Sequence, residues 1–177
     1  GDDPLTRRLT VTADGRAIGE VAAQAGRFDV PARSATYEIR YDTDASAFAP
    51  VSTRTSTTWR FRSAAPAGHA GVPVPLLTVD CDLGLDLRNQ PTGGPATFQV
   101  ARVAGSGTAK VTRLRLWTSL DDGTTWRRVE VTDSGGGKFS ATLPKAAAGQ
   151  AVSIRVAAED AGGSAIDQQI IRAYHVR

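Results

Sequence analysis

Short stretches in which apolar and polar residues alternate recur along the whole chain, and they predict an all-β fold. In residues 36–41, for example, Tyr37, Ile39 and Tyr41 fall on one face of an extended segment. This period of two is typical of a strand with one buried face. Similar patterns predict strands over residues 5–12, 17–21, 28–31, 51–62, 77–81, 96–103, 111–119, 126–131, 138–143, 152–158 and 166–174.

The distribution of these strands predicts two domains joined by a linker. Residues 64–75 are rich in Ala, Pro and Gly and have no usable periodicity, as expected of a linker. Residues 1–63 then form a small antiparallel β domain. Residues 76–177 hold about seven short strands with frequent turn signals, which is typical of an immunoglobulin or fibronectin type III sandwich. We therefore expect two antiparallel β-sandwich domains, the second immunoglobulin- or fibronectin type III-like.

The most specific motif is an octapeptide that fits the Asp-box pattern Ser-x-Asp-x-Gly-x-Thr-Trp, with Ser119, Asp121, Gly123 and Trp126 at fixed positions. Asp121 is suited to accept backbone N–H bonds across a turn. Gly123 tolerates the positive φ that a tight turn requires. The motif therefore predicts a rigid corner between two strands, and this is favoured over the alternative that Asp121 and Asp122 form a metal or catalytic pair.

Two predicted strands carry a tryptophan near arginines and supply the candidate binding surface. In residues 111–119 an exposed Trp117 between arginines is a candidate stacking platform for sugar or peptide. In residues 51–62 the arginines form a candidate cationic stripe for an acidic polymer. The favoured interpretations are instead a Trp117 buried in the core or between the domains, and an ordinary solvated outer face of an antiparallel sheet. The candidate residues are Trp117, Arg113, Arg115, Trp59, Arg60 and Arg62.

Composition and charge argue against a membrane-spanning protein and against a nucleic-acid-binding protein. The 177 residues are 41% hydrophobic, which is enough for a sizeable core, but no apolar run approaches the ~20 residues of a membrane span. The net charge of +3 is mild and its charges are interspersed, so neither a nucleic-acid partner nor a membrane is expected. The polar start at Gly1, without Met or a signal peptide, predicts a processed or engineered piece.

The chain lacks the residue sets of the common hydrolytic sites. His69 lies in the predicted linker and His175 near the end, and neither has the Gly-rich neighbours that position a catalytic imidazole. No Gly-x-Ser-x-Gly turn occurs, and no spacing suits zinc. The single cysteine, Cys81, excludes an intrachain disulfide and is expected to be a buried thiol, with intermolecular pairing left open.

No cofactor is expected. Calcium remains an alternative, because Asp80, Asp82, Asp86 and the pair Glu159–Asp160 supply oxygen-rich turns. Solvated strand ends and Asx-turns are the favoured interpretation of these carboxylates.

Several stretches resemble the C-terminal region of secreted subtilisin-like (S8 family) serine peptidases of Streptomyces and related actinobacteria. The resemblance covers most of the chain from about residue 35 onward, and Cys81 departs from it, since an aromatic or apolar residue is expected there. The similar stretches are residues 57–63, 76–82, 85–89, 116–126, 152–160 and 171–174.

The resemblance implies a secreted, non-catalytic appendage, because the catalytic triad of that family lies in an upstream domain and no position here matches it. The expected partners are that peptidase domain and a polymeric protein or cell-surface ligand. The expected roles are targeting, substrate or surface binding, or stabilisation of the peptidase. The alternatives are a free-standing extracellular carbohydrate- or cell-wall-binding module and, less favoured, an enzyme in its own right.

Overall fold

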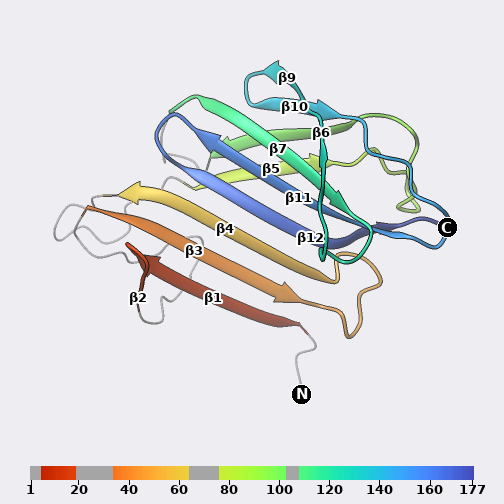
Figure 1. Cartoon of the computed structure of the whole chain (residues 1–177), viewed down its shortest axis with the longest axis horizontal. Coiled ribbons are helices and arrows are strands. Elements are labelled where there is room, and N and C mark those ends of the chain that lie inside the picture. Colours follow the sequence, from red (N-terminus) through yellow and green to blue (C-terminus); the bar gives the residue numbers. More distant parts are fainter. Residues whose placement is uncertain (1–4, 19–33, 64–75, 103–107) are drawn as a thin grey trace.

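The computed structural model describes residues 5–18, 34–63, 76–102 and 108–177, and over these ranges it contains strands and no helix, which confirms the all-β prediction (Figure 1). The strands are β1 (Thr6–Ala13), β2 (Arg16–Ile18), β3 (Ala35–Asp44), β4 (Arg54–Ser63), β5 (Leu77–Asp82), β6 (Ala96–Arg102), β7 (Val111–Ser119), β8 (Arg127–Val129), β9 (Thr132–Gly135), β10 (Lys138–Ala141), β11 (Ala151–Asp160) and β12 (Ala165–His175).

The strands form two antiparallel sheets. The larger has eight strands in the order β2-β1-β3-β4-β12-β11-β7-β8, and the smaller has the order β5-β6-β10-β9. Within the larger sheet β4 pairs with β12, with Trp59 opposite Ile166 and Arg60 opposite Ala165. Strands from residues 1–63 and from residues 76–177, which the sequence predicts to be separate domains, therefore belong to one continuous sheet (Figure 1).

One hydrophobic cluster contains side chains of both sheets. From the larger sheet it takes Leu116 and Ile154, and from the smaller sheet Leu77 and Phe98, all with no exposed surface. Burial of such side chains is the main stabilising term in folding, at roughly 1.5–3 kcal/mol for each. Alternation along β7 and β11 supplies this cluster from one face of the strands, which leaves the polar side chains on the other face.

A second cluster belongs to the part of the large sheet built by β1, β3 and β4. Tyr37 and Phe61 stack within it, with ring centroids 5.6 Å apart, and Ile39 is fully buried beside them. Trp59 packs against both clusters, and its indole N–H donates to the carbonyl oxygen of Leu77 at 2.8 Å. Trp59 is therefore the side chain that joins the two cores.

Strand positions agree closely with the alternation, and the differences have local causes. β7 has the predicted bounds, whereas β4 begins at Arg54 rather than at residue 51. Ser52 has a φ of +49°, which takes the backbone out of the regular strand conformation. The backbone N–H groups of Ser52 and Thr53 donate to the carbonyl oxygens of Arg172 and Ile171, and the Thr53 carbonyl oxygen accepts from Ala45, directly after β3.

The structure adds one strand that the alternation does not predict, and two predicted segments lie outside the described residues. β9 was not predicted, because its glycine-rich end is typical of a turn, and it is held by pairing with β10. The predicted strand at residues 28–31 and the predicted linker at residues 64–75, with His69, lie outside the described residues.

Candidate functional site

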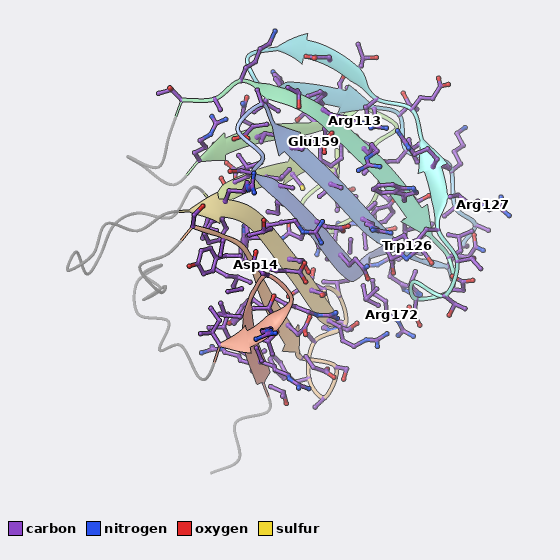
Figure 2. All side chains as sticks on the ribbon, turned by 60° about the vertical axis from the view of Figure 1, so that its left-hand side comes forward. Asp14, Arg113, Trp126, Arg127, Glu159 and Arg172 are labelled. Atoms are coloured by element: carbon purple, nitrogen blue, oxygen red, sulfur yellow. The ribbon has the colours of Figure 1, made fainter. Side chains whose placement is uncertain are left out.

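The polar face of the eight-stranded sheet, which we call the outer face, collects most of the residues that the sequence singles out. Cross-strand pairing places Trp117 opposite Arg155, Arg115 opposite Ala157, and Arg113 opposite Glu159. Figure 2 shows Arg113 and Glu159 side by side on β7 and β11. Farther along the same face, β4 presents Arg60 and Arg62. The outer face thus extends without interruption over strands from both ends of the chain.

Trp117 is the centre of a cluster of arginines on this face. The guanidinium carbon of Arg155 lies 4.7 Å from the centroid of the indole, that of Arg128 5.3 Å and that of Arg115 5.7 Å. Arg155 and Arg128 are the direct neighbours of Trp117 on β11 and β8, and Arg115 precedes it by two residues on β7. Trp117 is only partly exposed, so its ring serves less as a bare stacking platform than as a support that orders three guanidinium groups.

The three arginines differ in how their charge is compensated. Arg155 donates two hydrogen bonds to Asp167, at 3.0 and 2.6 Å, and both side chains are about a third exposed. The hydrogen bond to Asp167 raises the pKa of Arg155 above its usual value. Arg115 and Arg128 form no ion pair with any carboxylate of the described residues. The cluster therefore carries uncompensated positive charge beside the indole.

A shallow hollow of about 310 Å³ adjoins this cluster and reaches across the sheet to β4 and β3. Small and hydroxyl-bearing side chains such as Ala157, Ser56 and Thr58 line it, together with longer charged groups. Arg115 and Arg60 both border it, which brings two of the candidate residues to one depression. Arg60 donates to Glu38 at 2.8 Å, so its charge is compensated.

Trp59 lies apart from the other candidate residues. Its neighbours on β4, Arg60 and Phe61, show the alternation: Arg60 is exposed on the outer face and Phe61 is buried on the inner face, where Trp59 also lies. The Trp59 side chain packs against both hydrophobic clusters, and its indole N–H donates a hydrogen bond to the carbonyl oxygen of Leu77. It does not share a surface with Arg60 and Arg62.

Arg128, Arg155 and Asp167 are site residues that were not predicted from the sequence. The alternation predicts that Arg155 and Asp167 face outward, since each lies between inward-facing residues on its strand. That β11 runs between β7 and β12, and so brings Arg155 to both Trp117 and Asp167, follows from the strand order and not from any local pattern.

The Asp-box forms a corner between β7 and β8 that is held by hydrogen bonds among its own residues. The Ser119 hydroxyl donates to Asp121 at 2.6 Å and accepts the backbone N–H of Gly123 at 2.9 Å. Asp121 also accepts the backbone N–H of Thr125 at 2.8 Å and its hydroxyl at 2.6 Å. The ring of Trp126 packs over Gly123, which has a φ of +85°. Asp121 therefore stabilises the turn by accepting hydrogen bonds from both of its ends. Among the described residues, no group of side chains that could hold a metal ion includes it.

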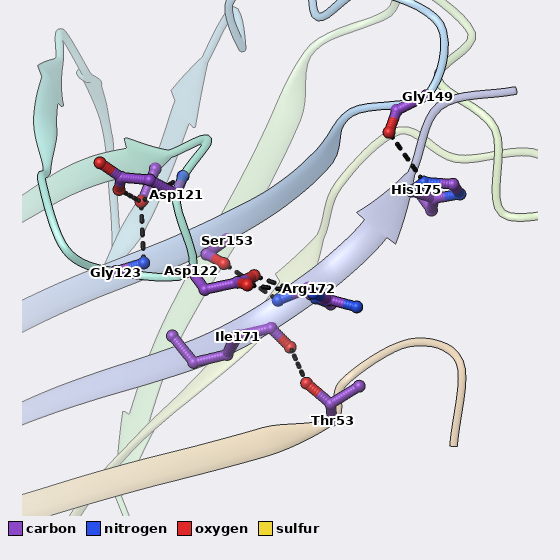
Figure 3. A network of polar contacts seen from close by, with 10 residues as sticks. Thr53, Asp121, Asp122, Gly123, Gly149, Ser153, Ile171, Arg172 and His175 are labelled. Atoms are coloured by element: carbon purple, nitrogen blue, oxygen red, sulfur yellow. Dashed lines mark hydrogen bonds and ion pairs between the residues drawn. The ribbon is translucent and has the colours of Figure 1, made fainter. Parts of the chain in front are cut away.

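Asp122 ties this corner to the last strand of the chain (Figure 3). Its two carboxylate oxygens accept from Arg172 on β12 at 3.0 and 3.1 Å, and this hydrogen bonding lowers the pKa of Asp122. The backbone N–H of Arg172 donates to the hydroxyl of Ser153 on β11 at 3.0 Å. The corner is therefore fixed to the end of the sheet at which β4 begins and β12 ends.

The pKa of Asp121 predicts acid sensitivity of this corner. The hydroxyl of Ser119, followed by the hydroxyl and the backbone N–H of Thr125, lowers that pKa from 3.8 to about 2. A carboxyl group with a lower pKa in the folded state stabilises the fold above its unfolded pKa, and this stabilisation is lost as the pH falls through the folded value. We therefore expect the difference in unfolding midpoint between the wild type and Asp121→Asn to shrink as the pH is lowered from about 4 to about 2.

Urea unfolding at a series of pH values measures this difference. Asp80→Asn is the matched control, because Asp80 is exposed on β5 and its carboxylate makes no hydrogen bond or ion pair in the described part of the chain. A difference between wild type and Asp121→Asn that is the same at pH 7 and at pH 2 would contradict the role assigned to the ionised carboxylate.

The other candidate groups have structural partners. Asp82 accepts the backbone N–H of Gly84, and Asp86 those of Arg88 and Gln90, as in Asx-turns. Asp160 accepts from Arg102 at 2.8 Å and from the backbone N–H of Ser164. Within the described ranges, no group of three or more His, Cys, Asp or Glu side chains is placed to hold a metal ion.

Cys81 and His175 show no feature of a reactive centre. Burial, followed by the charge of Asp80, raises the pKa of the Cys81 thiol to about 11, so the thiol stays protonated at neutral pH. The ring of His175 is hydrogen bonded to the carbonyl oxygen of Gly149 at 3.0 Å (Figure 3).

No helix long and apolar enough to cross a membrane occurs in the described residues.

Comparison with known proteins adds no relative. The chain matches no protein-family model, and no curated protein or solved structure is significantly similar to it.

Proposed function

We propose that this chain is the non-catalytic C-terminal region of a secreted subtilisin-like serine peptidase, and that it holds the peptidase on a polymeric substrate or a surface through the outer face of its large sheet. The observation that carries the proposal is the outer face itself, which is continuous over strands from both halves of the chain and presents the arginine cluster around Trp117. The sequence resemblance to the C-terminal regions of such peptidases supports the choice of parent protein.

The fold type belongs to the same proposal. In it, residues 76–177 form a β-sandwich of the immunoglobulin or fibronectin type III kind, and the strands of residues 1–63 extend its larger sheet instead of forming a detached module. A core shared by both sheets supports this arrangement. A large sheet widened in this way offers a broad, polar and only shallowly hollowed surface, which suits a polymer better than a small molecule because a small-molecule site is usually a deep and mostly apolar pocket.

The role proposed is binding and not catalysis. His175 is exposed and bonds to a backbone carbonyl rather than to a serine hydroxyl or a carboxylate of the described residues. A nucleophilic serine requires a general base within hydrogen-bond reach. Catalysis is therefore assigned to the upstream peptidase domain of the proposed parent protein.

The experiment compares the native full-length protein with this chain alone. A serine-directed fluorophosphonate probe is expected to label the full-length protein and to leave the chain unlabelled. Removal of residues 1–177 is expected to leave hydrolysis of a soluble peptide intact and to reduce retention on an insoluble substrate. Stoichiometric labelling of the chain, or equal retention of the truncated peptidase, would contradict the proposal.

A free-standing extracellular carbohydrate- or cell-wall-binding module is the second candidate. The hollow beside the Trp117 cluster favours it, because the lining includes hydroxyl, amide and charged groups suited to sugar hydroxyls, next to small apolar side chains. The carbohydrate-binding function is favoured over the peptidase appendage if the native protein contains no probe-reactive serine and the chain alone is retained on an insoluble glycan.

A further inference from the structure

The Trp117 cluster holds more positive charge than the surrounding side chains neutralise. Three guanidinium groups lie within 6 Å of one indole centroid, at 4.7, 5.3 and 5.7 Å. Arg155 alone has a carboxylate partner, Asp167. Arg128 is exposed and Arg115 partly exposed, and neither forms an ion pair with a described residue. Because all three guanidinium groups lie within 6 Å of the same ring centroid, their positive charges act together in the space beside the indole and attract an anion there.

We propose that Arg115 and Arg128, supported by Trp117, form a subsite for the carboxylate or sulfate group of an acidic polysaccharide. This inference rests on the proposed binding role of the outer face and names the ligand class. Guanidinium groups bind planar or tetrahedral oxyanions with two parallel hydrogen bonds, which makes arginine the side chain best suited to such groups.

The indole lowers the cost of forming this subsite. A free arginine side chain loses conformational freedom when it is fixed on a ligand. Arg115 and Arg128 already lie against the ring and on neighbouring strands, with Trp117 opposite Arg128. Part of the ordering is therefore complete before the ligand arrives, which favours binding.

The adjoining hollow indicates why the anion belongs to a polysaccharide. Arg115 borders the hollow of about 310 Å³, so a chain whose anionic group lies at Arg115 continues into it. Hydroxyl and amide groups of Ser56, Thr58 and Gln169 are available there to sugar hydroxyls. The carboxylates of Glu38, Glu159 and Asp167 also line the hollow, so an uncharged part of the polysaccharide lies there and its anionic group lies at Arg115 and Arg128. Arginine clusters also bind acidic peptides, so the assignment to a polysaccharide rests on the hydroxyl and amide groups of the lining, and poly-L-glutamate is the probe that separates the two ligand classes.

Asp167 limits the affinity of the subsite. It binds Arg155 through two hydrogen bonds and thereby withholds the third guanidinium of the cluster from an external anion. Removing this carboxylate releases Arg155, which lies closest to the indole. Asp167→Asn is therefore expected to strengthen anion binding several-fold, whereas a loss of function is the usual result of a substitution at a binding site.

The test measures binding of the chain to heparin, a sulfated probe, and to polygalacturonate, a carboxylated probe, with dextran as the neutral probe. We expect both acidic probes to bind more tightly than dextran, and this binding to weaken as salt is added. Arg115→Ala and Arg128→Ala are each expected to reduce the affinity for the acidic probes about tenfold. Melting curves of each variant establish that it is folded.

Two matched controls isolate the subsite from net charge. Arg127→Ala removes the same charge one residue before Arg128. Arg127 is exposed but pairs with Thr118 and not with Trp117, so it lies on the other face of β8, and the substitution is expected to leave binding unchanged. Asp80→Asn changes the net charge by the same amount as Asp167→Asn but lies on the small sheet, and it is expected to have little effect. Equal losses in Arg127→Ala and Arg128→Ala would overturn the proposal.

Other outcomes separate this inference from the proposed function. Equal binding of poly-L-glutamate through the same arginines would overturn the assignment to a polysaccharide in favour of an acidic peptide. Retention on an insoluble neutral or protein polymer that is unaffected by Arg115→Ala and Arg128→Ala would overturn the anion subsite and leave the tethering role intact. Absence of binding to every polymer would contradict both.

Discussion

Replacement of Trp59 by alanine is expected to lower the free energy of unfolding by about 3 kcal/mol, because tryptophan-to-alanine substitutions in cores cost roughly 3–5 kcal/mol and this ring is partly exposed. Trp59 lies opposite Ile39 on β3 and opposite Ile166 on β12, and these two residues belong to different hydrophobic clusters. Its removal therefore opens a gap at the point where the clusters meet. Denaturant unfolding followed by fluorescence and circular dichroism measures the loss.

The control for this prediction is Trp59→Phe, which keeps most of the packing and removes the indole N–H that donates to Leu77. Its expected cost is about 1 kcal/mol, the value of one hydrogen bond. Neither variant is expected to weaken binding to an acidic polymer under conditions in which it stays folded, since Trp59 faces the core. A Trp59→Ala variant with unchanged melting temperature and lost binding would contradict this and return Trp59 to the binding surface.

The second large effect is expected at the Asp-box. Gly123→Ala should destabilise the chain by about 3 kcal/mol, from two causes that add: a left-handed backbone at an alanine and a forced contact. Gly123 has a φ of +85°, and an added Cβ would lie 3.0 Å from Cζ2 of Trp126 and 3.1 Å from Cδ1 of Ile171. Relief of the contact would require the Trp126 ring and the end of the Ile171 side chain each to move by a few tenths of an ångström.

Gly149→Ala separates the two causes. Gly149 has almost the same φ, +87°, and nothing lies within 4 Å of the position of an added Cβ. It is expected to show only the backbone cost, about 1–2 kcal/mol. Equal destabilisation by the two substitutions would show that packing of Trp126 and Ile171 around Gly123 contributes nothing, and that the corner is held by its hydrogen bonds alone.

The two predictions concern one property of the fold, the attachment of distant segments to β12. β12 pairs with β4 on one side and with β11 on the other, and its Ile171 and Arg172 contact the start of β4 and the Asp-box corner. The outer face exists as a single surface because of these attachments. A substitution that loosens them is therefore expected to disturb the arrangement of Arg115 and Arg60 around their common hollow.

The sequence by itself determined the positions and facing of the strands and the conformation of the Asp-box. Both are local properties: alternation decides which side chains of a strand can be buried together, and Ser119, Asp121 and Gly123 bond within their own turn. For this reason the inward position of Tyr37 and Ile39 could be predicted from the sequence.

Only the tertiary structure decided which strands are neighbours, and this decided the candidate site. Arg155 and Arg128 reach Trp117 because β11 and β8 flank β7, and the period of two along a strand holds no information about its partners. For the same reason Trp59 could not be assigned to the joint between two cores until β4 was paired with both β3 and β12. The strands were local features of the sequence, whereas the charged surface they share is a product of their long-range pairing.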